Sequence, residues 1–246
     1  MKYFRRTLAV LILFALGPFS LVASGKVSLE GDWAEASRES SGLAPDPATH
    51  PGALVQVYAA RAFKWRGAFA VHTWIAIKPA HALNYTTYEV IGWHVGHGGS
   101  AIHIHDGAPD RYWYGARPSL LAELRGIPAV AAIAKIRRAV ADYPYGNEYR
   151  TWPGPNSNTF TAFVLRRVPA LKADLPPTAI GKDYLPGPSF VARTPSGAGL
   201  QVSAFGLLGL LVSAEEGFEI NILGLSAGVD FKDRALRLPG IGHWAP

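Results

Sequence analysis

The sequence predicts a single α+β domain, preceded by an N-terminal export segment and a linker. Short β-like runs occupy residues 54 to 95, helical patterns follow as far as Pro169, and short strands between Gly-Pro loops come last. Segregated strands and helices are typical of α+β folds, whereas α/β folds alternate the two. The chain has 246 residues, 49% of them hydrophobic, so it can bury one substantial core without a second domain.

The first 24 residues have the pattern of a secretory signal peptide or a signal anchor. The basic start MKYFRR precedes the apolar run TLAVLILFALGPFSLVA, and Val22-Ala23-Ser24 suits cleavage before Gly25. The apolar run is intermediate in length between a signal core and a bilayer span, so cleavage and retention as a transmembrane helix both stay open. The positive-inside rule then predicts a protein of the cell envelope. It is either anchored in the inner membrane and facing the periplasm, or free in the periplasm.

Charge and composition exclude several function classes. The formal charge is +6, but three basic residues lie within the first six positions, which leaves 21 basic against 18 acidic residues. This balance is unlike that of a nucleic-acid binder, which concentrates Lys and Arg on one face. The absence of cysteine excludes disulfides, thiolate metal sites and a cysteine nucleophile. We therefore expect no nucleic-acid partner, and we expect no cofactor.

Local sequence patterns predict the linker and the strands in the first half of the domain. Residues 25–52 are rich in Ser, Gly, Pro and charge and lack a hydrophobic period, so they predict a linker or a wrapped surface segment before a domain over residues 53–246. The runs LVQVYAARAF, GAFAVHTWIAIK and TTYEVIGWHV predict three strands, with a hairpin turn at residues 64–67 between the first two. Alternation along the second run puts Thr73 on the aliphatic face and His72 on the opposite face.

Helical patterns follow the strands. PSLLAEL (118–124) and PAVAAIAKIRRAVADY (128–143) predict two helices, and the second has proline in its first turn. A third helix is predicted to start in the Asn156-Ser157-Asn158 triplet, one of whose residues caps it, and to stop at Pro169.

The C-terminal region mixes Gly-Pro loops with two or three predicted short strands. It contains a glycine-rich apolar run, AGLQVSAFGLLGLLVSA (198–214), which ends on two glutamates. We interpret this run as a buried element or as a membrane-facing patch, because it is shorter than the usual bilayer span.

The serine of the triplet can be interpreted in two ways. A hydroxyl at a helix N-terminus can cap the helix, or it can act as a nucleophile in the positive field of the helix dipole. A serine nucleophile needs a neighbouring base, and His72 on a nearby strand is the candidate. A lone histidine on a half-buried strand can equally be structural, so spacing alone leaves both interpretations open.

Several motifs resemble a known family. They are HTWIAIKP (72–79), YEVIGW (88–93), YPYGNEYRTWPGPNSNTFTAFVLRRVP (143–169), LPPTAIGKDY (175–184) and LRLPGIG (236–242). Together they resemble the bacterial family of exported or membrane-associated proteins known as domain of unknown function 3750, over most of the chain from about Leu54 onward. This resemblance implies an envelope protein and brings no established activity.

A more distant similarity is to circularly permuted papain-like hydrolases of the NlpC/P60 type. In these proteins a strand histidine precedes an Asn-Cys-x-x-Phe helix start, and here His72 precedes Asn156-Ser157-Asn158-Thr159-Phe160, with serine in place of cysteine. The similarity implies an antiparallel sheet packed against helices. It also implies a cleft between the histidine strand and the serine helix.

This similarity assigns candidate roles. Ser157 is the nucleophile, His72 the base, and His94 or Glu89 the group that orients the base; since these two lie on opposite faces of the third run, only one can do so. Asn156 or Asn158, together with backbone N–H groups, would hold the oxyanion. Trp152 beside the site could stack on a sugar or line an acyl groove.

A histidine-rich segment, WHVGHGGSAIHIHDG (93–107), is a weak candidate for a metal site. His103 and His105 would project from one face of a strand, and imidazole suits zinc, copper or nickel. Two glycines interrupt the cluster and no HExxH motif accompanies it, so solvated loop histidines are the preferred interpretation and no metal is assigned.

The function expected from the sequence is that of an envelope hydrolase or acyltransferase acting on peptide, amide or ester bonds. Its partner would be an envelope substrate, either a peptidoglycan peptide or a lipid acyl group, with membrane attachment through the N-terminal segment. The alternative is a non-catalytic envelope-binding protein with a degenerate papain-like cleft.

Overall fold

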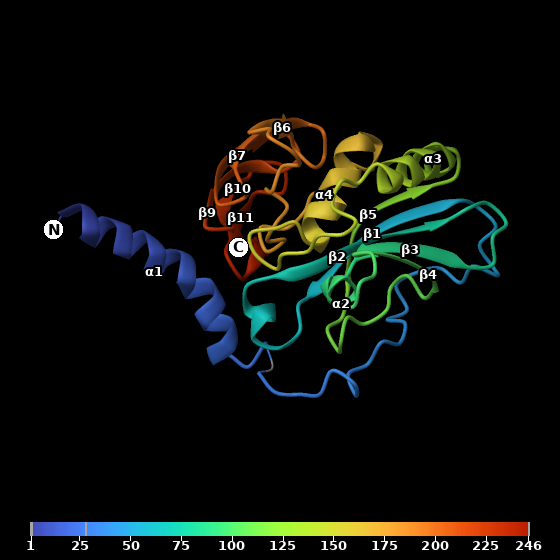
Figure 1. Ribbon diagram of the computed structural model, residues 1–246, viewed down its shortest axis with the longest axis horizontal. Helices are drawn as coiled ribbons and strands as arrows, with labels where there is room; N and C mark the ends of the chain where they lie inside the picture. The colour runs from blue at the N-terminus through green and yellow to red at the C-terminus, as the bar shows by residue number, and fades with distance from the viewer. Residues whose placement is uncertain (1, 28, 246) are drawn as a thin grey trace.

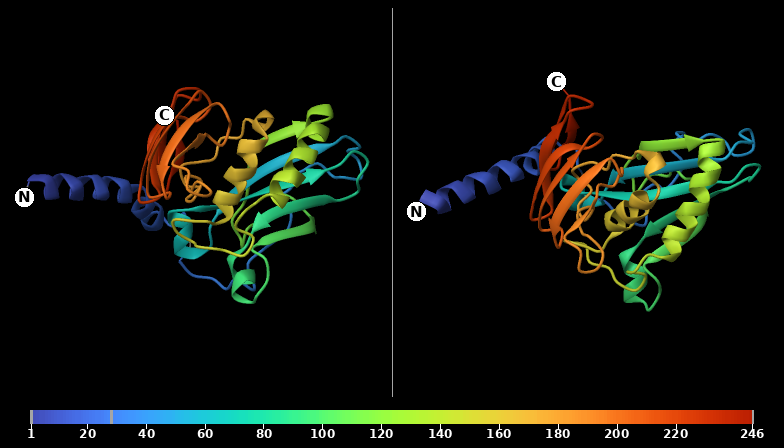
Figure 2. Two further views of the ribbon diagram at one scale, coloured as in Figure 1. Left: turned by 45° about the horizontal axis from the view of Figure 1, so that its top comes forward. Right: turned by 90° about the horizontal axis from the view of Figure 1, so that it is seen from above.

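The computed structural model describes residues 2–27 and 29–245, which form an N-terminal helix, two antiparallel sheets and helices that pack between them (Figures 1 and 2). Two helices cover one face of the first sheet. The second sheet lies on the far side of one of them, α4, and contributes the C-terminus. This arrangement confirms the α+β class.

The first sheet has five strands in the order β4-β3-β2-β1-β5, and each strand is antiparallel to its neighbours. The central strand β2 pairs with β1 along its whole length, with His72 opposite Ala60. Its pairing with β3 begins only at Ile75, opposite Tyr88, so the first residues of β2 do not pair with β3. The strands are β1 Leu54–Arg61, β2 Val71–Lys78, β3 Tyr85–Val90, β4 Ile102–Gly107 and β5 Ser119–Arg125.

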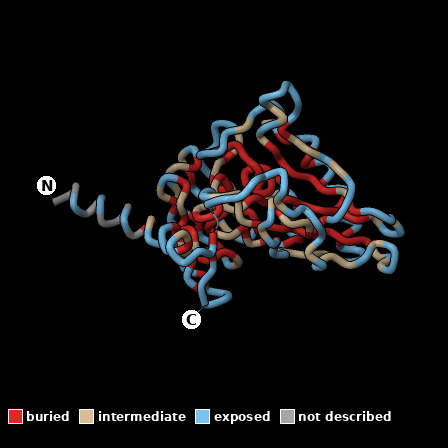
Figure 3. The backbone as a smooth tube through the Cα atoms, turned by 90° about the horizontal axis from the view of Figure 1, so that it is seen from below, coloured by how far each residue is buried: buried red, intermediate tan, exposed pale blue. Residues whose placement is uncertain are grey.

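Helices α3 (Ile127–Ala141) and α4 (Ser157–Arg167) pack on one face of this sheet. Their buried side chains meet Val55, Ile75 and other aliphatic residues from β1, β2 and β3 in the main hydrophobic core. Figure 3 shows the buried stretches gathered in this body of the molecule. The remaining helical segments are α1 Lys2–Ala23, η1 Lys64–Ala68, α2 Gly92–Gly96 and η2 Pro169–Leu171.

The opposite face of the five-stranded sheet is covered by loops rather than helices. Tyr58 and Trp74 form a second core cluster there with Trp113. The segment predicted as a linker wraps over this face, because the Asp110 carboxylate accepts hydrogen bonds from Ser40 Oγ and from backbone N–H groups including that of Leu43. The linker is therefore a wrapped surface segment.

The second sheet has seven strands in consecutive order, β12-β11-β10-β9-β8-β7-β6, and forms an antiparallel meander. The run at 198–214 is one hairpin of this sheet, and the described C-terminal region has seven strands where two or three were expected. The strands are β6 Val191–Arg193, β7 Gly199–Ala204, β8 Leu208–Ser213, β9 Gly217–Ile222, β10 Leu225–Asp230, β11 Ala235–Leu238 and β12 Gly242–Trp244.

A buried polar network joins this sheet to the rest of the chain. Asp183 accepts hydrogen bonds from the amide nitrogens of Gln201 and Asn221, on two different strands. Its neighbour Lys182 donates to Glu219 on β9 at 2.5 Å. The segment just before the sheet is thereby tied to the inner face of the sheet through charged hydrogen bonds.

Three predicted elements differ from the structure. PSLLAEL forms strand β5 instead of a helix, because it pairs antiparallel with β1 and completes the sheet edge. The run TTYEVIGWHV leaves the strand after Val90 and enters α2, so His94 lies on a short helix. The connection at 64–67 belongs to the 3₁₀ segment η1 and is not a tight hairpin turn.

The N-terminal segment forms α1. Within the residues that the structure describes, which exclude Met1, no helix combines the length and the apolar character needed to cross a bilayer. The expectation of a transmembrane helix over residues 1–24 is therefore not supported.

Candidate active site

A large cavity opens where the start of β2, the start of α4, segment η1 and the turn between β9 and β10 come together. Its volume is about 1050 Å³, at the upper end of the usual range for ligand pockets. Both His72 and Ser157 line it, although they are 85 positions apart in the sequence. Its wall is rich in aromatic side chains, which are Trp33, Phe63, Trp65, Phe69, Trp93, Trp113, Tyr114, Tyr149 and Trp152.

His72 is held by two neighbours in the cavity wall. Its Nε2 lies 2.8 Å from Glu89 Oε2, and the Glu89 side chain is fully buried. Trp113 stacks on the imidazole with ring centroids 3.6 Å apart and an interplanar angle of 6°. The ring orientation is thus fixed by a charged hydrogen bond on its edge and by an indole on its face.

Glu89 is the centre of a cluster of hydrogen-bonding side chains. Its Oε1 accepts from Arg111 at 2.6 Å and lies 3.3 Å from His103 Nδ1 and 3.1 Å from His105 Nε2. Burial alone would raise the pKa of Glu89, but hydrogen bonds from His103, His105 and His72 outweigh it and hold the pKa well below its usual value. Glu89 is therefore a carboxylate at neutral pH.

This charge state determines the tautomer of His72. Burial lowers the pKa of His72 below its usual value of 6.5, and the attraction of Glu89 offsets this only in part, so the ring is neutral at pH 7. A carboxylate can only accept hydrogen bonds, so Nε2 must carry the ring proton, which leaves a lone pair on Nδ1. Nδ1 has no hydrogen-bond partner among the described residues, and His72 lines the cavity, so the Nδ1 lone pair is available as a base.

Ser157 is the first residue of α4, and Asn156 is the cap. Asn156 Oδ1 accepts from the backbone N–H groups of Asn158 and Thr159, and the Thr159 side chain accepts from the Asn156 backbone in a reciprocal capping box. Within the described residues Ser157 Oγ forms no hydrogen bond, and it is not a fully enclosed atom. The hydroxyl is therefore free of the capping role and open to the cavity.

The side chains proposed from sequence for the oxyanion are already engaged. The Asn156 amide nitrogen donates to the carbonyls of Thr151 and Ile180, and that of Asn158 donates to the carbonyls of Val71 and Ile180. With both amide protons used, neither side chain has a donor left for a ligand. In the part of the chain that the structure describes, the first-turn backbone N–H of Ser157 has no partner, so it is the donor that the helix start leaves available.

Asn158 instead aligns the two elements of the site. Its Oδ1 accepts from Thr73 Oγ1 at 2.9 Å, on the residue next to His72. Together with the Asn158 bond to the Val71 carbonyl, this ties the start of α4 to the start of β2. No hydrogen bond links Ser157 Oγ to His72 in the described residues. The two groups share a cavity without a hydrogen bond between them in this part of the structure.

The two remaining candidates lie apart from the base. His94 makes an edge-on ring contact with His103, at 4.9 Å between centroids, and it does not contact His72. Of the two alternatives, Glu89 is the one that meets the base. Trp152 lines the cavity and donates its indole N–H to the Leu223 carbonyl in the β9–β10 turn.

The preferred interpretation of solvated loop histidines is wrong for His103 and His105: both lie half-buried on one face of strand β4 and reach Glu89. Their donor atoms and a Glu89 oxygen lie within 4.8 Å of one another, which is close enough for a shared metal ion. However, the Arg111 guanidinium already binds the same oxygen and would repel a cation there. The cluster is explained as donors to a buried carboxylate.

Sequence reasoning missed Trp113 and Arg111. Both come from the loop after β4, in the stretch DRYWYG, which has no period and no recognised motif. The only local signal was an arginine two residues before a tryptophan in an otherwise polar loop. Neither the stacking of Trp113 on His72 nor the hydrogen bond of Arg111 to Glu89 could be inferred without the fold.

Comparison with known families gives one match. The model of the family described as Protein of unknown function (DUF3750) matches residues 52–184, which include His72, Glu89, Arg111 and Ser157 but stop before the seven-stranded sheet. The resemblance from about Leu54 onward is thus confirmed for this region, whereas the LRLPGIG motif lies beyond it. No curated protein and no solved structure gives a significant match. The family match covers more than half of the chain, so this protein belongs to the DUF3750 family.

Proposed function

We propose that this protein is a serine-dependent hydrolase or acyltransferase with Ser157 as nucleophile, His72 as base and Glu89 as the residue that positions the base. The proposal rests on one observation. His72 is neutral and oriented, and its free Nδ1 opens onto the same cavity as Ser157, which begins α4 but does not cap it. A helix cap needs no aligned histidine–carboxylate pair beside it. The arrangement is the one expected of a papain-like cleft with serine in place of cysteine.

In the proposed reaction, Ser157 Oγ attacks the carbonyl carbon of a peptide, amide or ester while its proton moves to His72 Nδ1. The carbonyl oxygen becomes an oxyanion that the Ser157 backbone N–H and the positive end of α4 stabilise. His72 then gives the proton to the leaving amine or alcohol, and an acyl-Ser157 intermediate remains. Water or an acceptor nucleophile, deprotonated by the same histidine, releases the acyl group.

The aromatic wall supports substrates with large apolar or stacking groups. A cavity of about 1050 Å³ accommodates a lipid acyl chain or a peptidoglycan peptide with its sugar. We place the protein in the cell envelope, held at the inner membrane and facing the periplasm or released there after cleavage of residues 1–24. The N-terminal basic and apolar pattern supports this placement.

Non-catalytic binding is the competing function. The missing contact between Ser157 Oγ and His72 favours it, because a resting serine enzyme usually shows that hydrogen bond, although such bonds can lengthen in ligand-free sites. A binding protein would use the same aromatic cavity and would form no covalent intermediate.

Labelling of the full chain with a fluorophosphonate probe, read by intact mass, tests the proposal. A catalytic Ser157 gives one adduct, which is lost in Ser157→Ala and in His72→Ala but kept in the control Ser100→Ala, at an exposed loop serine. Circular dichroism confirms that each variant is folded. Absence of an adduct, or an adduct that survives Ser157→Ala, contradicts the enzyme assignment.

A further inference from the structure

We propose that the outer face of the seven-stranded sheet docks on a phospholipid bilayer. The outer face is the face turned away from α4, and Figures 1 and 2 show no helix or loop covering it. Apart from Arg193, which pairs with Leu200 from the edge strand β6, its side chains are apolar and most are exposed; Leu200 is 63% exposed and Val212 57%. The outer face takes no part in the proposed chemistry, so docking through this face does not depend on that chemistry.

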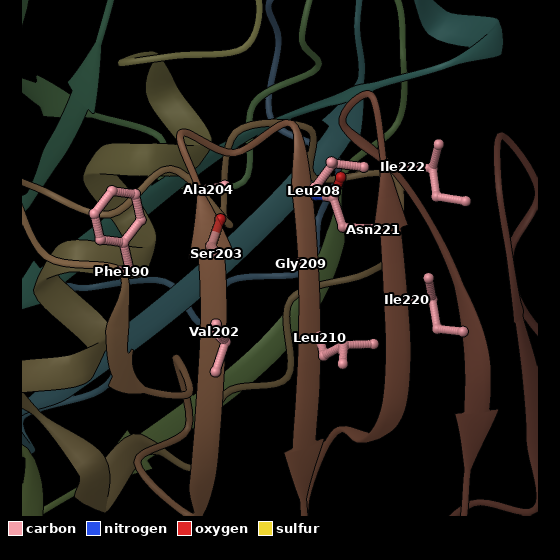
Figure 4. A pocket seen from close by; sticks show the side chains of 10 residues that line it. All are labelled: Phe190, Val202, Ser203, Ala204, Leu208, Gly209, Leu210, Ile220, Asn221 and Ile222. Atoms are coloured by element: carbon pink, nitrogen blue, oxygen red, sulfur yellow. The ribbon is translucent and has the colours of Figure 1, made fainter.

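The strand register shows that these side chains form continuous rows. Val202 pairs with Val191 on one side and with Leu210 on the other, and Leu210 pairs in turn with Ile220. Directly paired residues of neighbouring strands project from the same face. Figure 4 views this face at the groove between these strands. A second row crosses most of the sheet through Leu200, Val212, Phe218, Val229, Leu236 and Trp244.

The inner face of the same sheet has the opposite character. Gln201, Glu219, Asn221, Asp230 and Arg237 alternate with the outer residues along the strands, and each is at most 4% exposed. A sheet of a water-soluble domain normally buries its apolar face and exposes its polar face. The inverted pattern is the one found where the outside of a sheet meets lipid.

The two ends of the meander also differ in polarity. One end carries the turns FGL (205–207), LG (223–224) and PGI (239–241), which contain no charged residue. The other end carries AEE (214–216) and FKDR (231–234), which contain five charges. Such a gradient along the strands fits a sheet whose uncharged end enters the lipid more deeply.

The N-terminal helix joins the molecule at the uncharged end. Gly17 and Pro18 of α1 pack against the backbone of the 239–241 turn. Figures 1 and 2 show α1 leaving the molecule on the side of the outer face. Leu8, Ile12 and Leu16 recur every four residues along α1 and are exposed, so they form an apolar stripe on this helix.

Segment η1 adds an interfacial anchor at the same place. It contacts the C-terminal half of α1, and its Trp65 is 57% exposed between Lys64 and Arg66. A tryptophan flanked by basic residues suits the headgroup region, where the indole is amphipathic and anionic lipids attract the cations. A dimer interface formed by two outer faces would need neither the uncharged end nor this anchor, so we commit to a bilayer.

Site-specific quenching in full-length protein tests this docking directly. The chain has no cysteine, so Leu210→Cys can carry a single environment-sensitive fluorophore. The matched control is Ile127→Cys, at an 86% exposed position on α3 away from the outer face. With vesicles of phosphatidylglycerol and phosphatidylethanolamine carrying brominated acyl chains, we expect quenching of the label at 210 and none at 127.

Each other outcome overturns the proposal. Vesicle-bound protein without quenching at 210 means that another segment, such as α1, makes the contact. A blue shift at 210 without bromolipid quenching, together with a dimeric mass, identifies a second copy as the occupant. Protein that does not bind the vesicles leaves the outer face without a membrane role.

Substitutions give a quantitative check. Leu200→Gln, Leu210→Gln and Val212→Gln together are expected to lower the vesicle partition coefficient by about tenfold or more, while Ile127→Gln leaves it unchanged. Unchanged partitioning of the folded triple variant contradicts the proposal. If that variant fails to fold, the quenching of the labelled Leu210→Cys protein decides the question by itself.

Discussion

Glu89 is the residue on which the candidate site depends most. Period-two alternation correctly separated His72 from Thr73, but it could not choose between Glu89 and His94 as the partner of the base. The choice depends on where β3 ends, since His94 is in the strand pattern by sequence and on a helix in the fold. Cross-strand contacts such as Glu89 with His103 require the register, which local patterns do not contain.

Replacing Glu89 with Gln tests its positioning role. Glu89 raises the pKa of His72 against the lowering effect of burial, so the neutral amide should lower that pKa further. In the native protein the labelling rate should fall below pH 6.5, as His72 becomes protonated. This fall, the acid limb of the pH profile, should move to lower pH in Glu89→Gln. The plateau rate should fall by about a hundredfold, because the amide no longer fixes the tautomer.

The measurement is the pseudo-first-order labelling rate from pH 4.5 to 8. His94→Gln serves as the control, and its acid limb should stay in place because His94 does not contact His72. An unchanged limb and plateau in Glu89→Gln contradict the positioning role, provided that its thermal melt shows a folded protein.

Helix α4 connects sequence to site most simply. Its start in the Asn-Ser-Asn triplet and its end before Pro169 were predicted from capping and from proline chemistry, and both are confirmed. What the sequence left open was which residue caps. The capping box requires an acceptor three residues before Thr159, which selects Asn156 and frees Ser157.

Asn156→Ala should therefore destabilise the protein, by about 2 kcal/mol or more. The alanine removes the cap and the amide donor to the Thr151 carbonyl, while the Ile180 carbonyl keeps its hydrogen bond from Asn158. Ser157→Ala removes no hydrogen bond and should stay within about 0.5 kcal/mol of the native value. Urea unfolding compares the two, and equal losses would refute the division of roles between neighbouring residues.

Strand β5 shows where local patterns fail. PSLLAEL has the residues of a short helix, yet it supplies the edge of the sheet through six residue pairs between β5 and β1. The tertiary partner overrides the local preference, which is weak over so few residues. The hairpin of β7 and β8 was not predicted, because the whole run appears apolar in sequence. Its polar side chains, such as Gln201 and Ser203, face inward.

The seven-stranded sheet is held to the rest of the chain by buried charge, and this makes the stability of the whole molecule depend on pH. Burial alone would raise the pKa of Asp183, but the Lys182 charge and the hydrogen bonds from Asn221 and Lys182 lower it below 3.8. A carboxyl whose pKa is lower in the folded state contributes stability above its unfolded pKa and loses it as pH falls. Asp174, held by His243 and Arg237, acts in the same direction.

The melting temperature should therefore fall steeply below about pH 5. Asp183→Asn should lower stability at pH 7, because it leaves Lys182 short of a buried anionic partner, and it should flatten the decline in acid. The exposed Asp233→Asn is the matched control and should follow the native curve. A native melting temperature that is level from pH 7 to pH 3 would contradict the network account.

The family match ends at residue 184, directly after the Lys182-Asp183 pair that the inner face of the seven-stranded sheet binds. The catalytic candidates therefore lie inside the family region, and the proposed bilayer surface lies outside it. Leu223 and Leu225 of the second sheet nevertheless line the cavity. A bilayer on the outer face would consequently place the mouth of the cavity close to lipid.

The reactivity of a thiol at position 157 tests the central claim most directly. In Ser157→Cys the thiol is the only one in the chain, so its alkylation rate by iodoacetamide against pH gives its pKa without a substrate. We predict that the pKa of this thiol is below the usual value of about 8.5 and that it rises in the double variant Ser157→Cys/His72→Ala. In the control Ser100→Cys, the thiol pKa should not change when His72 is replaced with Ala. A thiol pKa at 157 that is ordinary and indifferent to His72 would contradict a histidine-activated Ser157.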